Sequence, residues 1–191
     1  MINIAIFASG NGTNAQCIID YFKGNDKIRV VLILSNKTDA FVLKRAEQAG
    51  IPTRTFTQQI LRDNAEILKY LDQFDVNFIV LAGFLLLMPT AIIQRFQNRI
   101  VNIHPALLPA YGGKGMYGNN VHKAVIANGE TESGITIHYV NENYDDGAII
   151  FQARCPVLKD DSPERLADRV HKLEHLHYPQ IISDLVNNKK T

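Results

Sequence analysis

Short apolar runs alternate with longer amphipathic segments over the first hundred residues of the chain. Such alternation is typical of βαβ units, in which each helix returns the chain to start a new parallel strand. The strands expected from this pattern are 2–8, 28–34, 52–56, 78–82 and 100–103. The helices expected between them are 14–23, a segment capped by Asp39 that ends near Gly50, 61–74, and a short helix with Pro89 in its first turn that runs through Phe96.

The pattern changes after Gly134, where two β-rich runs, 135–140 and 148–157, are separated by turn residues. They predict a hairpin that extends the sheet. One long amphipathic helix is expected from Pro163 to about Val186, with Asp161 or Ser162 near its cap, followed by a solvated tail over residues 187–191. The fold class predicted is therefore α/β: an open, mostly parallel sheet with flanking helices and a C-terminal β-hairpin plus long helix.

Composition limits the size and the partners of this fold. With 191 residues and 46% hydrophobic content, the chain is expected to form one domain. A net charge of +1 gives no field to attract nucleic acid or an anionic membrane, so a small-molecule partner is favoured. Cys17 and Cys155 are far apart and lack metal-ligand spacing, which favours buried thiols in a reducing compartment. Without a basic leader or a membrane-length apolar stretch, a cytoplasmic protein is expected.

The first chemical signal is Ser9–Asn14, where the first strand gives way to a helix. Glycines allow a tight turn there, and the free N–H groups of a helix N-terminus attract phosphate or carboxylate. Gly10, Gly12 and Ala15 fit the dinucleotide fingerprint GxGxxA, but residues 34–37 offer no acid for a ribose hydroxyl. A monophosphate ligand is favoured over a dinucleotide, and a tight turn without a ligand is the alternative.

The second signal joins Asn102 and His104 with Asp145. Alternate strand residues point the same way, so the amide and the imidazole can reach one pocket. With a carboxylate they can stabilise an oxyanion and move a proton, which points to acyl-type transfer. No GxSxG elbow or reactive-cysteine signature accompanies them. The alternative is structural: Asn102 and His104 anchor the next loop, and Asp145 forms a turn before Gly147.

These motifs together carry a resemblance to a known family. The segments that carry it are Asn102 with the following Ile-His-Pro-Ala-Leu-Leu-Pro, Ser9–Asn14, Leu34–Lys37, Leu81–Phe84 and Glu174-His175. In this order and length the chain resembles the folate-dependent formyltransferases of the glycinamide ribonucleotide transformylase family, over nearly its whole length. The resemblance implies a single Rossmann-like formyltransferase domain over 1–191, with a phosphate-binding N-terminal half of about 1–100 and a catalytic and folate-binding part of about 80–191.

The resemblance also implies an activity. It is the transfer of a formyl group from the co-substrate 10-formyltetrahydrofolate to the amine of 5-phosphoribosylglycinamide (glycinamide ribonucleotide), in de novo purine biosynthesis. By resemblance, Gly12, Thr13 and Asn14 hold the substrate phosphate and Glu174 holds the ribose hydroxyls.

The catalytic roles come from the same resemblance. Asn102 and a protonated His104 donate to the oxyanion, and Asp145 keeps the imidazole charged or carries a proton through a water. No metal is expected. His171 and His175 lie four residues apart, but no HExxH motif or third ligand accompanies them.

The folate site implied by the family departs from its usual sequence in places. Leu85-Leu86-Leu87 stands where a basic residue is often found, and Arg62 could supply the charge. The residues expected to contact folate are Arg62, Leu85, Leu86, Leu87, Met88, Asn102, Tyr139, Val140 and Asp145.

Three further positions carry open alternatives. The loop Tyr111–His122 is longer than usual and is either a mobile lid, in which Lys114 meets a phosphate or the folate glutamate, or a plain flexible loop. Asp146 occupies the place of a glycine, which leaves open whether it or Asp145 faces the site. His138 is either a core histidine or a partner that orients Asp145.

Other functions share parts of this sequence pattern. A methionyl-tRNA or sugar-nucleotide formyltransferase usually has an added C-terminal domain, and a formyltetrahydrofolate deformylase an added N-terminal one, whereas this chain has the length of the core alone. The alternative from another class is a non-catalytic module that binds a phosphate or a nucleotide. The expected partners are the two small-molecule substrates, with no nucleic acid and no membrane, and the protein is expected to be a monomer or a homodimer.

Overall fold

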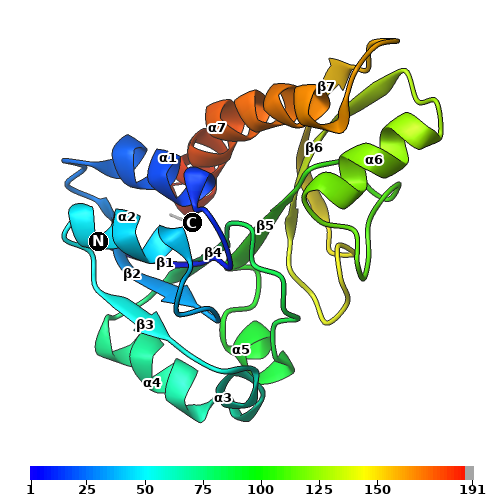
Figure 1. Cartoon of the computed structure of the whole chain (residues 1–191). Helices are drawn as coiled ribbons and strands as arrows, with labels where there is room; N and C mark the ends of the chain where they lie inside the picture. Colours follow the sequence, from blue (N-terminus) through cyan, green and yellow to red (C-terminus); the bar gives the residue numbers. More distant parts are fainter. Residues whose placement is uncertain (188–191) are drawn as a thin grey trace.

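A seven-stranded sheet forms the centre of the protein, in the order β3-β2-β1-β4-β5-β6-β7 (Figure 1). A computed structural model describes residues 1–187. The strands are β1 Ile2–Phe7, β2 Ile28–Ser35, β3 Thr53–Thr55, β4 Phe78–Leu81, β5 Ile100–His104, β6 Glu132–Tyr139 and β7 Ile149–Pro156. The helices are α1 Thr13–Phe22, α2 Phe41–Gln48, α3 Gln58–Asp63, α4 Ala65–Gln73, α5 Thr90–Arg95, α6 Asn119–Ala127 and α7 Pro163–Asn187.

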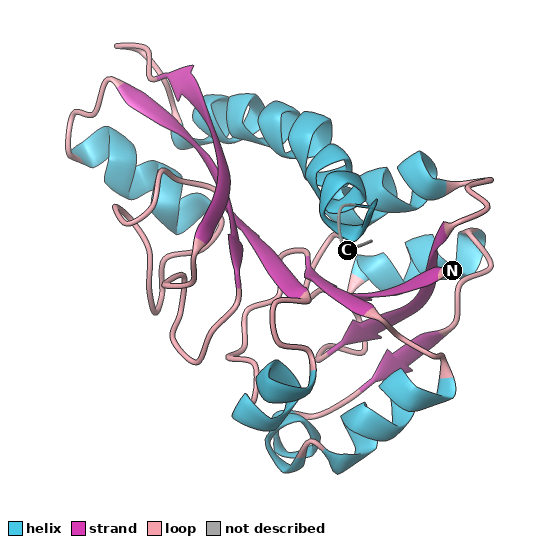
Figure 2. Ribbon diagram, turned by 180° about the vertical axis from the view of Figure 1, so that it is seen from behind, coloured by secondary structure: helices cyan, strands magenta, loops and turns pink. Residues whose placement is uncertain are grey.

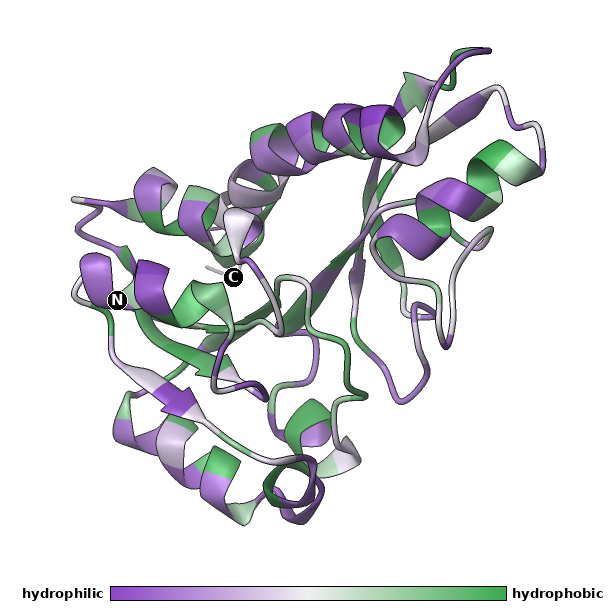
Figure 3. Ribbon diagram, viewed as in Figure 1, coloured by the Kyte–Doolittle hydropathy of each residue, from purple (hydrophilic) through white to green (hydrophobic). Residues whose placement is uncertain are grey.

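Alternate residues of β1 supply the two cores of the fold. Ile4 and Ile6 are fully buried on the face covered by α1, α2 and α7, whereas Ala5 and Phe7 are buried on the face covered by α3, α4 and α5. Because both faces are covered, the central strands are apolar throughout, and Figure 3 shows them mostly in the hydrophobic colour. This confirms the α/β class predicted from the hydrophobic pattern.

The direction of pairing changes at β5. Strands β1 to β5 pair in parallel, whereas β6 pairs antiparallel with β5 and β7 antiparallel with β6. The hairpin β6–β7 extends well beyond the parallel strands, as Figure 2 shows, and confirms the predicted C-terminal hairpin. No helix within residues 1–187 is long and apolar enough to cross a membrane.

Two predicted helix boundaries were wrong. The single helix expected over 61–74 is two helices, because Asn64 adopts a left-handed backbone with φ 52° and Thr57 caps an earlier start. Asp39 does not cap α2, whose first turn instead uses a backbone acceptor: the N–H of Val42 donates to the carbonyl of Gly10, 3.2 Å away.

The sequence pattern also missed α6. The long loop predicted over 111–122 ends at Gly118, and the helix that follows buries Val121, His122 and Val125 against the core. Near the C-terminus the prediction was better, since the Ser162 hydroxyl accepts from the N–H of Arg165 in the first turn of α7. Of the tail expected over 187–191, only Asn187, the last residue of α7, lies within the described residues.

Tyr178 fixes α7 to the sheet at the point where the parallel strands end. Its ring is fully buried, and its hydroxyl lies 2.9 Å from the carbonyl oxygen of Leu81 on β4 and 3.2 Å from that of Val101 on β5. Since a buried carbonyl without a donor is costly, this one hydroxyl, shared between the two carbonyls, stabilises the packing of α7 against β4 and β5.

We expect Tyr178→Phe to lower the free energy of unfolding by about 1–3 kcal/mol, because the substitution leaves these buried carbonyls without that donor. Urea unfolding followed by circular dichroism measures the change. Tyr21→Phe is the matched control, since the Tyr21 hydroxyl bonds Gln180 at the surface and its loss should change stability by less than about 0.5 kcal/mol. Equal effects of the two substitutions would contradict this role of Tyr178.

Candidate active site

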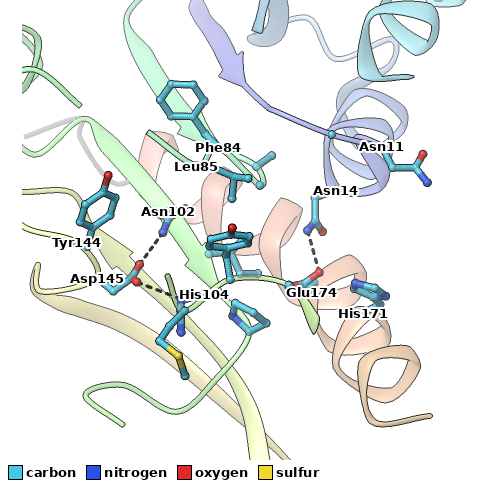
Figure 4. A pocket seen from close by; sticks show the side chains of 18 of the residues that line it. Asn11, Asn14, Phe84, Leu85, Asn102, His104, Tyr144, Asp145, His171 and Glu174 are labelled. Atoms are coloured by element: carbon cyan, nitrogen blue, oxygen red, sulfur yellow. Dashed lines mark hydrogen bonds and ion pairs between the residues drawn. The ribbon is translucent and has the colours of Figure 1, made fainter. Parts of the chain in front are cut away.

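A cavity of about 600 Å³ lies at the carboxyl ends of β1, β4 and β5 (Figure 4). This is the edge of the sheet at which open α/β proteins bind ligands, and β1 and β4 flank the point where the strand order reverses. The lining comes from 10–14, 82–85, 102–105, 113–118, His122, Tyr144, Asp145, His171 and Glu174. The fold thus joins both chemical signals of the sequence in one cavity.

One end of the cavity is the N-terminus of α1. The helix has no side-chain cap and no acidic residue in its first turn, so its first N–H groups are open to an anion. Gly12 precedes it with φ 75°, and a Cβ at this position would lie 2.5 Å from the side chain of Val42. Only glycine therefore allows α2 to pack against this turn. Thr13 and Asn14, the first residues of the helix, both line the cavity.

Glu174 on α7 meets the same end of the cavity. It is 5% exposed, and the Asn14 side chain donates to its Oε2 over 2.9 Å. Burial raises the pKa of Glu174, and the hydrogen bond from Asn14 and the charges of nearby His171 and His104 only partly offset this. A polar ligand with hydroxyl donors would satisfy this carboxylate.

The polar trio of Asn102, His104 and Asp145 forms the middle of the cavity, as Figure 4 shows. The Asn102 amide nitrogen lies 3.2 Å from His138 Nε2 and 3.4 Å from Asp145 Oδ1. Since His138 Nδ1 lies 2.8 Å from the Tyr139 carbonyl, this ring can donate there and accept from Asn102 at Nε2. His138 is buried and its Nε2 lies 3.7 Å from Asp145 Oδ1, so its position fits both a core histidine and a partner that orients Asp145.

His104 has an acceptor beside each ring nitrogen. Nδ1 lies 3.4 Å from Asp145 Oδ2, and Nε2 lies 2.8 Å from the carbonyl oxygen of Tyr111. A doubly protonated ring satisfies both acceptors, because it donates from both nitrogens. The predicted polar trio is therefore brought together in space.

Asp145 is largely buried, and burial alone would raise its pKa. The pKa is nevertheless lowered well below its usual range, because His104, His138 and the N–H of Gly113 all donate to the carboxylate or lie beside it. Asp146 is exposed and accepts from Asn141 and Asn143, away from the cavity. Asp145, rather than Asp146, therefore faces the site.

Side chains of the hairpin β6–β7 form hydrogen bonds to the backbone of the loop that follows His104. The buried Thr136 hydroxyl donates to the carbonyl of Ala106 and accepts from the N–H of Leu108. Gln152 donates to the same hydroxyl and to the Leu108 carbonyl. This network fixes the backbone that leaves β5 after the catalytic candidates.

The residues expected to contact folate divide into two groups. Leu85, Asn102 and Asp145 line the cavity, and Leu85 is 37% exposed there. The remaining six, namely Arg62, Leu86, Leu87, Met88, Tyr139 and Val140, are not among its lining residues. The Met88 side chain is buried in the core, and the Leu85 N–H is already bonded to the Ser9 hydroxyl over 3.1 Å. Their roles toward folate stay predictions.

Several lining residues were not singled out from the sequence. His122, on the helix that the sequence pattern missed, is buried with Nδ1 unpartnered, and burial together with the charges of His171 and His104 lowers its pKa to about 4. His171 also lines the cavity, although the sequence pattern points to it only as a metal-ligand candidate without a third ligand. The exposed Tyr117 lies on the glycine-containing loop that lines the cavity, together with Lys114, which was singled out from the sequence. A buried position at helical spacing would have been the only sequence signal for His122.

The fold and the site together define a formyl transferase. The chain matches the formyl transferase family over residues 2–182, and it belongs to that family. This confirms the resemblance carried by the motifs.

Three similar proteins carry the name phosphoribosylglycinamide formyltransferase. The chain is 41% identical to the chloroplastic phosphoribosylglycinamide formyltransferase of Arabidopsis thaliana, over 97% of this chain and 66% of that protein. It is 40% identical to the phosphoribosylglycinamide formyltransferase of Haemophilus influenzae, over 95% of this chain and 86% of that protein. The crystal structure of phosphoribosylglycinamide formyltransferase from Anaplasma phagocytophilum superposes with a TM-score of 0.89 at 32% identity, over 98% of this chain and 88% of that chain.

Glu174→Gln should make the protein more stable at neutral pH, by about 0.5–2 kcal/mol, the usual size of a stabilising substitution. The pKa of Glu174 is raised above its ordinary value of 4.5, so the folded state binds more protons than the unfolded state above that pH. The wild type therefore loses stability as the pH rises from 4.5 through the raised pKa of Glu174. The difference between variant and wild type should therefore be small near pH 4.5 and widen toward neutral pH. Urea unfolding across pH 4.5 to 8 measures it.

Glu142→Gln, at an exposed position in the loop before β7, is the control for this experiment. Its effect on the free energy of unfolding should be small at every pH. A difference for Glu174→Gln that stays constant from pH 4.5 to 8 would show that the carboxylate is not destabilised by burial.

Proposed function

We propose that the protein transfers the formyl group of 10-formyltetrahydrofolate to the amine of 5-phosphoribosylglycinamide, a step of de novo purine biosynthesis. One observation carries this proposal: a single cavity connects the uncapped N-terminus of α1 with Asn102, His104 and Asp145. An anionic substrate held at the first end would present its other end to groups suited to acyl transfer. The names of the relatives support the same reaction.

The phosphoribosyl end of the substrate would lie at α1. Backbone N–H groups after Gly12, with Thr13 and Asn14, would hold the phosphate, and the helix dipole favours its charge. The buried Glu174 would accept hydrogen bonds from the ribose hydroxyls, which compensate a carboxylate that burial otherwise disfavours.

The chemical step needs a donor for the developing oxyanion. As the amine attacks the formyl carbon, a C–N bond forms and the carbonyl electrons move to oxygen. Asn102 and a protonated His104 would donate to that oxygen. Their contacts to Asp145 are long, 3.4 Å each, and contacts of that length are readily exchanged for tighter ones to a substrate.

The same step must move one proton. The attacking amine becomes cationic and gives up a proton, and the folate nitrogen takes up a proton. The bond between the formyl carbon and the folate nitrogen then breaks as the carbonyl forms again. Asp145, ionised because its pKa is low, would keep His104 charged or relay this proton through a water. Tetrahydrofolate and the formylated amine are then the products.

Folate would enter over the apolar mouth of the cavity. Leu85, Tyr117 and Tyr144 line the cavity and are each more than a third exposed, and exposed apolar side chains at a concave site suit a flat heterocycle. Contacts to Leu86, Leu87, Met88, Tyr139 and Val140 would require folate to extend beyond this cavity. Arg62 or Lys114 would meet the glutamate of the folate tail.

We place the protein in the cytoplasm, as one domain that acts as a monomer or a homodimer. Its free thiols, Cys17 and Cys155, fit a reducing compartment. The functional division proposed is a phosphate-binding half of about 1–100 and a catalytic and folate-binding part of about 80–191. Glu174 belongs to the second part by sequence but contributes to the phosphate-binding end, because α7 brings it to Asn14 on α1.

We expect His104→Ala and Asp145→Asn each to lower kcat by a factor of about 10²–10³, because each removes a group that stabilises the transition state. The assay follows the absorbance of the product folate when 10-formyltetrahydrofolate and glycinamide ribonucleotide are mixed with the enzyme. Asp146→Asn is the matched control, since the neighbouring Asp146 is exposed and outside the cavity. It should retain full activity.

Two other outcomes would replace the proposal. Folate turnover that does not need the amine would identify a deformylase. No turnover under any condition, with glycinamide ribonucleotide still bound, would identify a binding module without catalysis.

A further inference from the structure

The backbone of residues 111–113 contacts both ionisable members of the polar trio: Tyr111 contacts His104, and Gly113 contacts Asp145. The Tyr111 carbonyl oxygen lies 2.8 Å from His104 Nε2, and two residues later the N–H of Gly113 donates to Asp145 Oδ2 over 3.0 Å. Gly112 lies between them, and a Cβ there would lie 2.6 Å from Leu108 and 3.3 Å from Asp145. This tripeptide is therefore packed directly against the trio.

The backbone of Tyr111 is in an uncommon conformation. Its φ is 57°, in the left-handed region that a bulky residue rarely adopts, and contacts elsewhere must hold it there. This conformation aims the Tyr111 carbonyl at His104 and sends the chain on toward Asp145. Outside the site, something must compensate the strain.

The side chain of Tyr111 supplies such an anchor. Its hydroxyl donates to Glu130 Oε1 over 2.6 Å and accepts from the Asn128 amide over 2.9 Å. Asn128 caps α6, and Glu130 follows in the turn to β6. Because Val125 of α6 is buried in the core, the far end of this tether is attached to the core of the protein.

We propose that Tyr111 is a positioning residue for the reaction: Glu130 and Asn128 hold its hydroxyl, and its backbone keeps His104 and Asp145 in register with the substrate. This inference rests on the proposed function, because its kinetic test measures formyl transfer. Tyr111, Asn128 and Glu130 lie outside the cavity lining, so they act through the trio and not on the substrate.

Tyr111→Phe should lower kcat about tenfold, with KM for both substrates changed less than twofold, since small displacements of reacting groups slow the chemical step more than binding. Glu130→Ala should lower kcat by the same factor as Tyr111→Phe, because it removes the acceptor of the same hydrogen bond. Glu130→Gln, which keeps an acceptor oxygen, should recover most of the activity. A kcat within twofold of wild type for Tyr111→Phe, or a loss confined to KM, would overturn the role.

Tyr70→Phe is the matched control. Tyr70 also donates to a glutamate, Glu66, at an exposed position on α4 that does not line the cavity. It should leave kcat unchanged. The double variant Tyr111→Phe with Glu130→Ala should be no slower than either single variant, because both break one tether. Multiplied losses in the double variant would contradict a shared tether.

A measurement without substrate separates this inference from the proposed function. In ¹⁵N-histidine-labelled protein, the ring N–H signal of His104, assigned by its absence in His104→Ala, reports the bond from Nε2 to the Tyr111 carbonyl. In Tyr111→Phe this proton should exchange with solvent at least severalfold faster, and in Tyr70→Phe at the wild-type rate. Unchanged exchange in Tyr111→Phe would overturn the positioning role. Failure of the wild type to transfer formyl groups would overturn only the proposed function.

Discussion

The arrangement of the site depends on the burial of one carboxylate, that of Asp145. A buried carboxylate is costly unless donors surround it, and here the groups around it come from three separate parts of the chain. Asn102 and His104 on β5 and the N–H of Gly113 in the loop before α6 are its donors, and His138 on β6 lies beside it. Each segment must be in place for the carboxylate to remain ionised, so the geometry of the trio is tied to the fold around it.

The cavity combines two carboxylates with opposite environments. Asp145 lies among donors and its pKa is lowered, whereas Glu174 is buried with one strong donor, Asn14, and its pKa is raised. The ionised Asp145 can stabilise a positive charge on His104, and Glu174 can accept hydrogen bonds from a ligand. His122 on α6 lines the same cavity, and because burial lowers its pKa to about 4, it adds no charge there at neutral pH.

The antiparallel hairpin of this Rossmann-like sheet fixes the surroundings of the polar trio. It supplies His138 from β6, and Thr136 and Gln152 fix the backbone that follows His104. Gly147 allows the turn that presents Asp145, since a Cβ there would lie 1.7 Å from the Tyr139 carbonyl. The parallel strands supply the anion end and the hairpin supplies the constraint on the trio, so both halves are needed for one cavity.

Local pattern determined the strands, most helices and the main polar residues of the site. Strand alternation and the glycines near residue 10 carry their signal within a few residues, so the sheet and the α1 anion end could be predicted from sequence. The burial of α6 against the core and the inward position of His122 depend on contacts between distant segments, and no short window contains them. Tertiary structure likewise decided between Asp145 and Asp146, because burial and backbone direction select one of these two similar neighbours. It also decided the tether from Tyr111 to Glu130, because these residues are 19 positions apart in the chain.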